Sequence, residues 1–156
     1  MPINYLNGDA TKPETEGMKI IAHVCNDVGM WEAGFIIALR KWPIAKDAYR
    51  APFIAGKGLS LSDVQFVPVE EDIVVANMVA QNGVGWEPGK CMVRYMALGI
   101  CLDKVFRRAI ELDATIHMPR IGCGLAGGEW SEVEKIMKIS LDRVNDALDV
   151  FVYDLK

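Results

Sequence analysis

Short apolar runs alternate with segments of helical periodicity along most of the chain. Apolar runs predict strands over residues 3–7, 18–24, 64–69, 73–79, 115–118 and 150–155, and 3.6-residue spacing predicts helices over 35–42, 45–50, 92–112 and after Ser131. Pro43 is expected to stop the first helix, and Ser131 and Glu134 have capping-box spacing at the last. This order predicts an α/β fold over residues 1–156, a single domain whose mixed, mostly parallel sheet carries helices on both faces.

Three loops follow predicted strands and contain glycine: residues 25–34, 81–90 and 120–130. Ligands of open α/β sheets bind beyond the carboxyl ends of the strands, where such loops meet. The three loops are therefore the candidates for a binding site.

The loop "RIGCGLAGGEW" (120–130) has four glycines and no lysine. Backbone N–H groups and a helix dipole at such a junction can hold a phosphate or diphosphate, and a plain strand-to-helix turn is the alternative. The loop is no P-loop, because GxxxxGK[ST] is absent. Gly122, Gly124 and Gly127 match GxGxxG, but no βαβ unit with an acidic residue follows them.

Composition narrows the function classes. Hydrophobic residues make up 51% of the 156 residues, and the formal net charge is −4. A negative balance argues against general nucleic-acid binding, and no apolar run of about 18 residues predicts a membrane span. The start "MPINYLNGDA" shows no signal-peptide pattern, so a cytoplasmic location is expected. The cysteines have no CxxC spacing, which predicts reduced thiols and neither a metal nor a cofactor: Cys25, Cys91, Cys101 and Cys123.

Two polar side chains stand directly after predicted strands. Asp9 can accept a hydrogen bond from an exocyclic amine such as adenine N6, or it can form a local turn. Asn26 can bind a ribose hydroxyl, or it can form an Asx-turn.

Five segments in this order together resemble the macro domain family, which binds ADP-ribose. They are "LNGDAT", "IIAHVCNDVGMWEAGFIIAL", "VVANMVAQNGVG", "HMPRIGCGLAGGEW" and "VFVYDL". The "HxCN" strand end and the "MPRIGCGL" loop are similar to the branch of ADP-ribose-1″-phosphate phosphatases and terminal ADP-ribose-glutamate hydrolases. The resemblance implies a three-layer macro domain that takes ADP-ribose or ADP-ribose-1″-phosphate, with an ADP-ribosylated protein as a further partner.

The resemblance also implies where the ligand lies. Adenine is expected beside Gly8, Asp9, Ala10 and Tyr153, and the distal ribose beside Asn26, Gly29, Gly34, Phe35 and the aromatic wall of Trp130. Core packing is the alternative for Trp130 and Tyr153. The diphosphate is expected on the backbone of Gly122, Cys123, Gly124, Leu125, Ala126 and Gly127.

The chain departs from this branch at residues that carry chemistry. In that branch, the enzymes that hydrolyse glutamate-linked ADP-ribose use a lysine after the central strand and an aspartate in the glycine loop. This chain has Gln81 (or Asn82) and Ala126 at the matching places. That mechanism is therefore not carried over. The first loop holds Met30, Trp31 and Glu32, which are expected to narrow the ribose pocket, and Glu32 to repel a phosphate there.

His23, Asn26 and Asp27 are the remaining candidates for catalysis, with water as the nucleophile. For His23 the alternative is a structural role, as we expect for His117. The dipoles of the glycine loop can lower the pKa of Cys123, but we expect this residue to contact a ligand through its backbone. The predicted function is hydrolysis of a group on the distal ribose, as in ADP-ribose-1″-phosphate phosphatases. The alternative is a non-catalytic reader or scavenger of ADP-ribose, and a P-loop-like nucleotide hydrolase is disfavoured.

Overall fold

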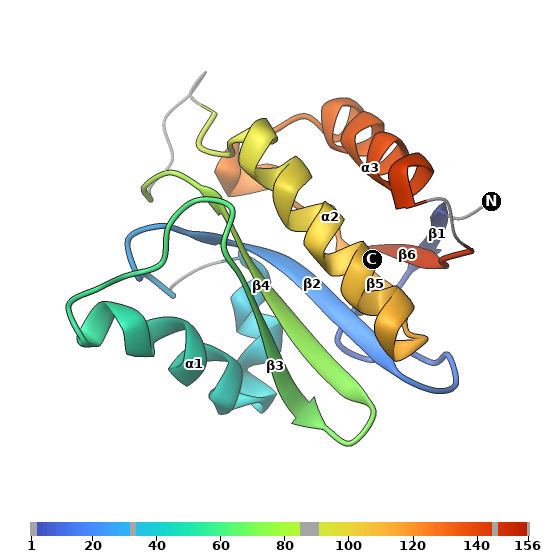
Figure 1. The fold of residues 1–156 in the computed structure, drawn as a ribbon, viewed down its shortest axis with the longest axis horizontal. Helices are drawn as coiled ribbons and strands as arrows, with labels where there is room; N and C mark the ends of the chain where they lie inside the picture. Colours follow the sequence, from blue (N-terminus) through green and yellow to red (C-terminus); the bar gives the residue numbers. More distant parts are fainter. Residues whose placement is uncertain (1–2, 32–33, 85–90, 145–146, 156) are drawn as a thin grey trace.

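The computed structural model describes residues 3–31, 34–84, 91–144 and 147–155 (Figure 1). Its strands are β1 (Ile3–Asn7), β2 (Lys19–Asn26), β3 (Val64–Glu70), β4 (Ile73–Gln81), β5 (Thr115–Pro119) and β6 (Val150–Asp154). The α-helices are α1 (Pro43–Ile54), α2 (Tyr95–Leu112) and α3 (Trp130–Val144), and two 3₁₀ segments are η1 (Gly34–Lys41) and η2 (Gly124–Ala126).

The strands form one six-stranded sheet in the order β1-β6-β5-β2-β4-β3. Only β3 runs antiparallel to its neighbour, and the other pairs are parallel. The predicted mixed, mostly parallel sheet is confirmed. Because β1, β6, β5, β2 and β4 point the same way, their carboxyl ends meet at one edge.

The sheet is buried on both faces, which explains the nearly continuous apolar runs of its central strands. On β2, Ile20 and Ala22 pack into the larger core beneath α2 and α3, whereas Ile21 packs with Leu39 and Trp42 in a second core on the side of η1 and α1. Figure 1 shows α2 lying across the strands with α3 beside it. The sheet thus lies between two helical layers, as predicted.

Helix α2 forms where the apolar stripe predicted it. Ala97, Cys101, Val105 and Ala109 are all buried on its inner face. The helix ends at Asp113, whose φ of 51° is left-handed. It begins at Tyr95 rather than Met92, because the N–H groups of Met92 and Val93 both donate to the main-chain oxygen of Ala126.

The segment after the first loop differs from the prediction. Residues 34–41 form a 3₁₀ helix in which only Leu39 is buried, instead of a buried α-helix. Pro43 does not merely stop this segment. It begins the 12-residue helix α1, which replaces the single helical turn expected over 45–50. Proline suits the first turn of a helix, where its missing N–H has no intrahelical acceptor.

The predicted capping box of the last helix is also wrong. Helix α3 begins at Trp130, and the main-chain oxygen of Glu129 accepts the N–H groups of Glu132 and Val133. Ser131 therefore lies inside the first turn instead of capping it. The carboxylate of Glu134 bonds to Tyr5 and Lys138.

Among the described residues, every buried side-chain nitrogen or oxygen has a hydrogen-bond partner. All four cysteines are free thiols. In the same part of the chain, no helix has the length and apolar character needed to cross a membrane.

Candidate functional site

A cavity of about 500 Å³ opens at the carboxyl ends of the edge strand β1 and its neighbour β6. It brings together Gly8, Asp9 and Tyr153, three of the four residues expected around adenine. Ala10 lies beside them but is buried, with 2% of its surface exposed. Side chains that the sequence did not single out complete the lining: Leu6, Asn7, Lys12, Glu14, Thr15 and Phe151.

The Asp9 carboxylate is fixed by its own loop. Its Oδ1 accepts hydrogen bonds from the N–H of Thr11 at 2.8 Å and from the Thr11 hydroxyl at 2.7 Å. Burial raises the pKa of Asp9. The bonds from Thr11 and the nearby charges of Lys41 and Lys12 lower it by a larger amount, so the net shift of the pKa is downward. The local turn is therefore present, and it orients an ionised carboxylate at the cavity.

Gly8 and Tyr153 lie against one another at this edge. Gly8 donates its N–H to the main-chain oxygen of Asp154 at 2.9 Å and has a φ of +150°, which L side chains rarely adopt. A Cβ built on Gly8 would lie 3.8 Å from Cδ2 of Tyr153. The glycine thus lets the chain turn beside the tyrosine ring.

The glycine loop leaves β5 and enters η2. Gly122, Gly124 and Gly127 all have positive φ, of 74°, 66° and 78°. Within the described chain, the N–H groups of Gly122, Cys123 and Gly124 donate to no acceptor. Gly128 donates its N–H to the main-chain oxygen of Gly122 at 2.8 Å, and a Cβ there would overlap that oxygen. The loop is therefore a closed turn with unpaired donors, which suits an anion.

The thiol of Cys123 does not have the lowered pKa that the loop dipoles could produce. Burial raises its pKa, and Cys91 adds to the rise against the opposing effect of Arg120. Its Sγ lies 3.6 Å from the main-chain oxygen of Ile121. Cys123 is therefore a neutral thiol, and only its backbone is suited to bind an anion.

The Asn26 side chain forms its hydrogen bonds with the backbone of its own loop. Its Oδ1 accepts the N–H groups of Val28 and Met30, both at 3.1 Å, and its Nδ2 donates to the Met30 oxygen at 2.7 Å. The Asx-turn alternative is the one the structure adopts. The Asn26 amide therefore stabilises the loop that follows β2 through bonds within residues 26–30.

Asp27 joins two of the three candidate loops. Its Oδ1 accepts the N–H of Gly83 at 2.9 Å, and its Oδ2 accepts Nδ2 of Asn82 at 3.0 Å. A carboxylate has about four lone-pair sites, so two remain for further donors. Asp27 is half-buried, and these bonds hold it in one orientation.

His23 lies in the core, with 1% of its surface exposed. The Asn77 amide donates Nδ2 to Ala45 and Gln65, so its Oδ1 faces the ring and accepts the Nε2–H of His23 at 2.5 Å. Burial lowers the pKa of His23 to about 4, against a smaller rise from Asn77. The ring is therefore neutral and enclosed, which favours the structural role over the acid–base role.

The aromatic side chains around His23 explain its enclosure. The rings of Trp31 and Phe35 have centroids 5.4 and 6.0 Å from the His23 ring.

Gly29 has a φ of +82°, and a Cβ built on it would lie 2.8 Å from Phe53. Gly34 starts η1 with nothing within 4 Å of a built Cβ. Glu32 and residues 85–90 of the 81–90 loop lie outside the described residues.

Trp130 does not lie beside the loop that follows β2. Its Nε1 donates to the Tyr5 hydroxyl at 3.1 Å, and the Arg120 guanidinium lies 5.2 Å from both rings. Tyr5 belongs to the edge strand β1, whereas Asn26 ends β2, with β6 and β5 between them. Trp130 therefore packs at the β1 side of the molecule, which favours the packing alternative for this side chain.

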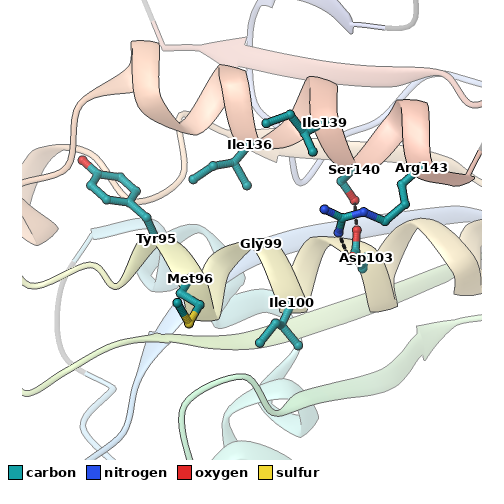
Figure 2. A pocket seen from close by; sticks show the side chains of 9 residues that line it. All are labelled: Tyr95, Met96, Gly99, Ile100, Asp103, Ile136, Ile139, Ser140 and Arg143. Carbon is teal, nitrogen blue, oxygen red and sulfur yellow. Dashed lines mark hydrogen bonds and ion pairs between the residues drawn. The ribbon is translucent and has the colours of Figure 1, made fainter.

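A second hollow, of about 290 Å³, lies between α2 and α3 and contains none of the predicted site residues (Figure 2). Met96, Ile100 and Ile139 are exposed along it. Asp103 closes one end, accepting hydrogen bonds from Ser140 and, at 2.6 Å, from Arg143. In the described part of the chain, no group of three His, Cys, Asp or Glu side chains is placed to hold a metal ion.

Comparison with solved structures gives the family. No family model matches the sequence. A macrodomain protein from Streptomyces coelicolor is 47% identical to this chain and superposes with a TM-score of 0.82, covering 97% of this chain and 98% of that one. The chain belongs to the macro domain family. A protein of unknown function from Bacteroides thetaiotaomicron is 44% identical, with a TM-score of 0.91 and 99% of each chain covered.

Curated relatives of this macro domain fall into two kinds. Chromodomain-helicase-DNA-binding protein 1-like from Mus musculus is 30% identical over 146 residues, and the match spans 87% of this chain but 16% of that protein. ADP-ribose 1″-phosphate phosphatase from Candida glabrata is 23% identical over 185 residues, with 98% of each chain covered. The chain thus spans about a sixth of the length of the first relative.

The sequence analysis did not identify Tyr49, whose hydroxyl bonds to Asn26 and Gly29 in the loop that follows β2. It is fully buried in α1, where no local pattern distinguishes it from a core aromatic residue. Phe151 could have been predicted from the sequence, because it stands two residues before Tyr153 on β6 and therefore shares its face.

Proposed function

We propose that this macro domain binds ADP-ribose, free or attached to a modified protein. The observation that carries the proposal is the glycine loop at the end of β5, in which the N–H groups of Gly122, Cys123 and Gly124 have no acceptor among the described residues. Diphosphate is the ligand group that best satisfies several convergent backbone donors without a lysine. The negative net charge of the chain does not oppose this, because the donors act locally.

The cavity at β1 and β6 supports the adenosine end of this proposal. Asp9 presents an oriented carboxylate with no partner on Oδ2 among the described residues, which suits the exocyclic amine of adenine. Tyr153 and Phe151 provide aromatic surface for a flat base. A nucleotide would then run from this cavity to the glycine loop, with the distal ribose toward Gly29 and Asp27.

The test is calorimetry with ADP-ribose and with AMP. We expect ADP-ribose to bind and AMP to bind more weakly, because AMP lacks the second phosphate and the distal ribose. Absence of heat with ADP-ribose, from protein shown to be folded by circular dichroism, would refute the proposal.

A second candidate function is removal of the 1″-phosphate from ADP-ribose-1″-phosphate. It is favoured by the Candida glabrata relative, whose whole length the match covers. Asp27 is the oriented carboxylate of the ribose loop, so we assign it the role of positioning water. The water oxygen would form a bond to phosphorus as the bond from phosphorus to O1″ breaks, and the proton that the water loses would pass to the ribose oxygen. His23 and Asn26 take no direct part, since both side chains are enclosed.

Phosphate release separates the two functions. Under the phosphatase proposal we expect Asp27→Asn to slow release by about 10²-fold or more while leaving ADP-ribose affinity within a few-fold. Asp47→Asn, a change to an exposed carboxylate on α1, serves as the matched control. Binding of ADP-ribose without phosphate release by the unmodified protein would instead identify a reader or scavenger.

A further inference from the structure

His117 stands directly behind the cavity at β1 and β6, and both of its ring nitrogens are hydrogen-bonded. Its Nδ1 lies 2.7 Å from the Tyr153 hydroxyl. Its Nε2 lies 2.8 Å from the Thr115 hydroxyl and 3.1 Å from the Thr15 hydroxyl. The ring itself has no exposed surface, so it acts on the cavity only through these neighbours.

Three of the side chains that contact His117 also line the cavity. Tyr153 and Thr15 are held by hydrogen bonds, and the ring of Phe151 stacks on His117 with centroids 5.1 Å apart and planes 9° apart. The Tyr153 ring is tilted by 37° to the imidazole. One buried ring therefore sets the position of two aromatic surfaces and one hydroxyl from separate segments of the chain.

The protonation state of His117 makes these bonds directional. Burial lowers the pKa of His117 to about 4, with a smaller contribution from Lys19, so the ring is neutral near pH 7. A neutral imidazole has one donor and one acceptor nitrogen. The Tyr153 hydroxyl is therefore bonded to the buried imidazole, while the ring of Tyr153 lines the cavity.

We propose that His117 is a positioning residue for the nucleobase end of the site, which sets the orientation of Tyr153 and Phe151 as the aromatic wall for the base. This inference rests on the proposed function, because the base belongs to the adenosine part of ADP-ribose. His117 never touches the ligand and acts through Tyr153.

The test is a double-mutant cycle on ADP-ribose affinity with His117→Phe, Tyr153→Phe and the double variant. The change His117→Phe keeps a ring against Phe151 but removes the hydrogen bonds of both ring nitrogens, to Tyr153, Thr115 and Thr15. We expect His117→Phe to weaken binding by about three- to tenfold in the unaltered background and by less than about twofold when Tyr153 is already Phe. AMP should show the same loss, since the base contact is what changes.

A change in stability alone would not produce this coupling. Ser140→Ala, which removes the bond to Asp103 on the far side of the sheet, is the control that lowers stability without changing affinity. If His117→Phe does not fold, His117→Gln keeps one donor and one acceptor and is expected to restore folding while still weakening AMP binding.

The outcomes are distinct. Coupled losses with ADP-ribose and AMP support the positioning role. If the unaltered protein binds ADP-ribose but the variants bind equally well, or their effects simply add, the role of His117 is refuted and the proposed function stands. If the unaltered protein does not bind ADP-ribose, both are refuted.

Discussion

The hydroxyl of Tyr49 lies 2.7 Å from the main-chain oxygen of Asn26 and 2.7 Å from its Oδ1. The same hydroxyl accepts the N–H of Gly29 at 3.1 Å. A single buried oxygen thus ties helix α1 to both sides of the loop that follows β2. The shape of the proposed ribose pocket depends on a residue that lies outside the loop.

Replacing Tyr49 with Phe tests this connection. The change leaves a buried N–H at Gly29 and an oxygen of Asn26 with fewer partners, so we expect a loss of about 1–3 kcal/mol in the free energy of unfolding. Weaker ADP-ribose binding is expected with it, as the loop loses its anchor. Urea denaturation and calorimetry measure the two effects. Tyr5→Phe, at an exposed hydroxyl, is the control and should cost less, and equal losses would contradict the prediction.

Two substitutions at Gly124 separate backbone strain from charge. Its φ of +66° makes any L residue unfavourable by about 1–2 kcal/mol, but nothing lies within 4 Å of a built Cβ. Gly124→Ala and Gly124→Glu therefore share the strain, and only the second brings a carboxylate to the unpaired N–H groups. We expect Glu to abolish ADP-ribose binding and Ala to reduce it by less than about tenfold. Equal affinity for the two variants in calorimetry would remove the loop from the site.

The two buried histidines predict how stability depends on pH. Burial lowers the pKa of both His23 and His117 to about 4, below the value of about 6.5 expected in the unfolded chain. The unfolded state therefore binds more protons between these values, and the free energy of unfolding falls as the pH falls through this window. The loss is on the order of 3 kcal/mol for each histidine by about pH 4.

Urea unfolding at about pH 7, 6 and 5 measures this slope. A variant in which His117 is Phe should retain only the part due to His23, which provides the internal comparison. Carboxylates with lowered pKa, such as Asp9, contribute mainly below this range. A free energy of unfolding that stays constant from about pH 7 to 5 would show that the histidines are not held neutral.

Asp103 offers a test of whether the groove between α2 and α3 is independent of the proposed site. Its carboxylate bonds Ser140 and Arg143 of the neighbouring helix. We expect Asp103→Ala to lower the free energy of unfolding by about 1–2 kcal/mol, because the half-buried bonds are lost, and to leave ADP-ribose affinity unchanged. Thermal unfolding and calorimetry check the two parts. A change in affinity would connect the groove to the ligand.

The layered architecture could be predicted because its causes are local. The continuous apolar run around Ile20 and Ile21 predicted a strand buried on both faces, and the stripe through Ala97 and Cys101 predicted a helix with one buried side. The errors fall where one tertiary contact decides an element's end. Ala126, more than 30 residues away in sequence, accepts the N–H groups of Met92 and Val93 and delays the start of α2.

The candidate site was predictable in its positions but not in its roles. Gly8, Asp9 and Tyr153 were expected together, and one cavity contains all three. The turn formed by Asn26 was one of the two alternatives expected, because its partners Val28 and Met30 are local. The hydrogen bond from His23 to Asn77 could not be predicted, because the two residues are 54 positions apart in the sequence.

Local sequence patterns are sufficient to place the alternation of strands and helices and to show which strand ends carry glycine and polar side chains. These follow from periodicity and from glycine's access to positive φ, which are properties of neighbouring residues. Which groups are left to bind a ligand depends instead on contacts between distant segments of the fold. Hydrogen-bond capacity is finite, so Tyr49, Asn77 and His117 determine, from inside the fold, which donors and acceptors remain unpaired at its surface.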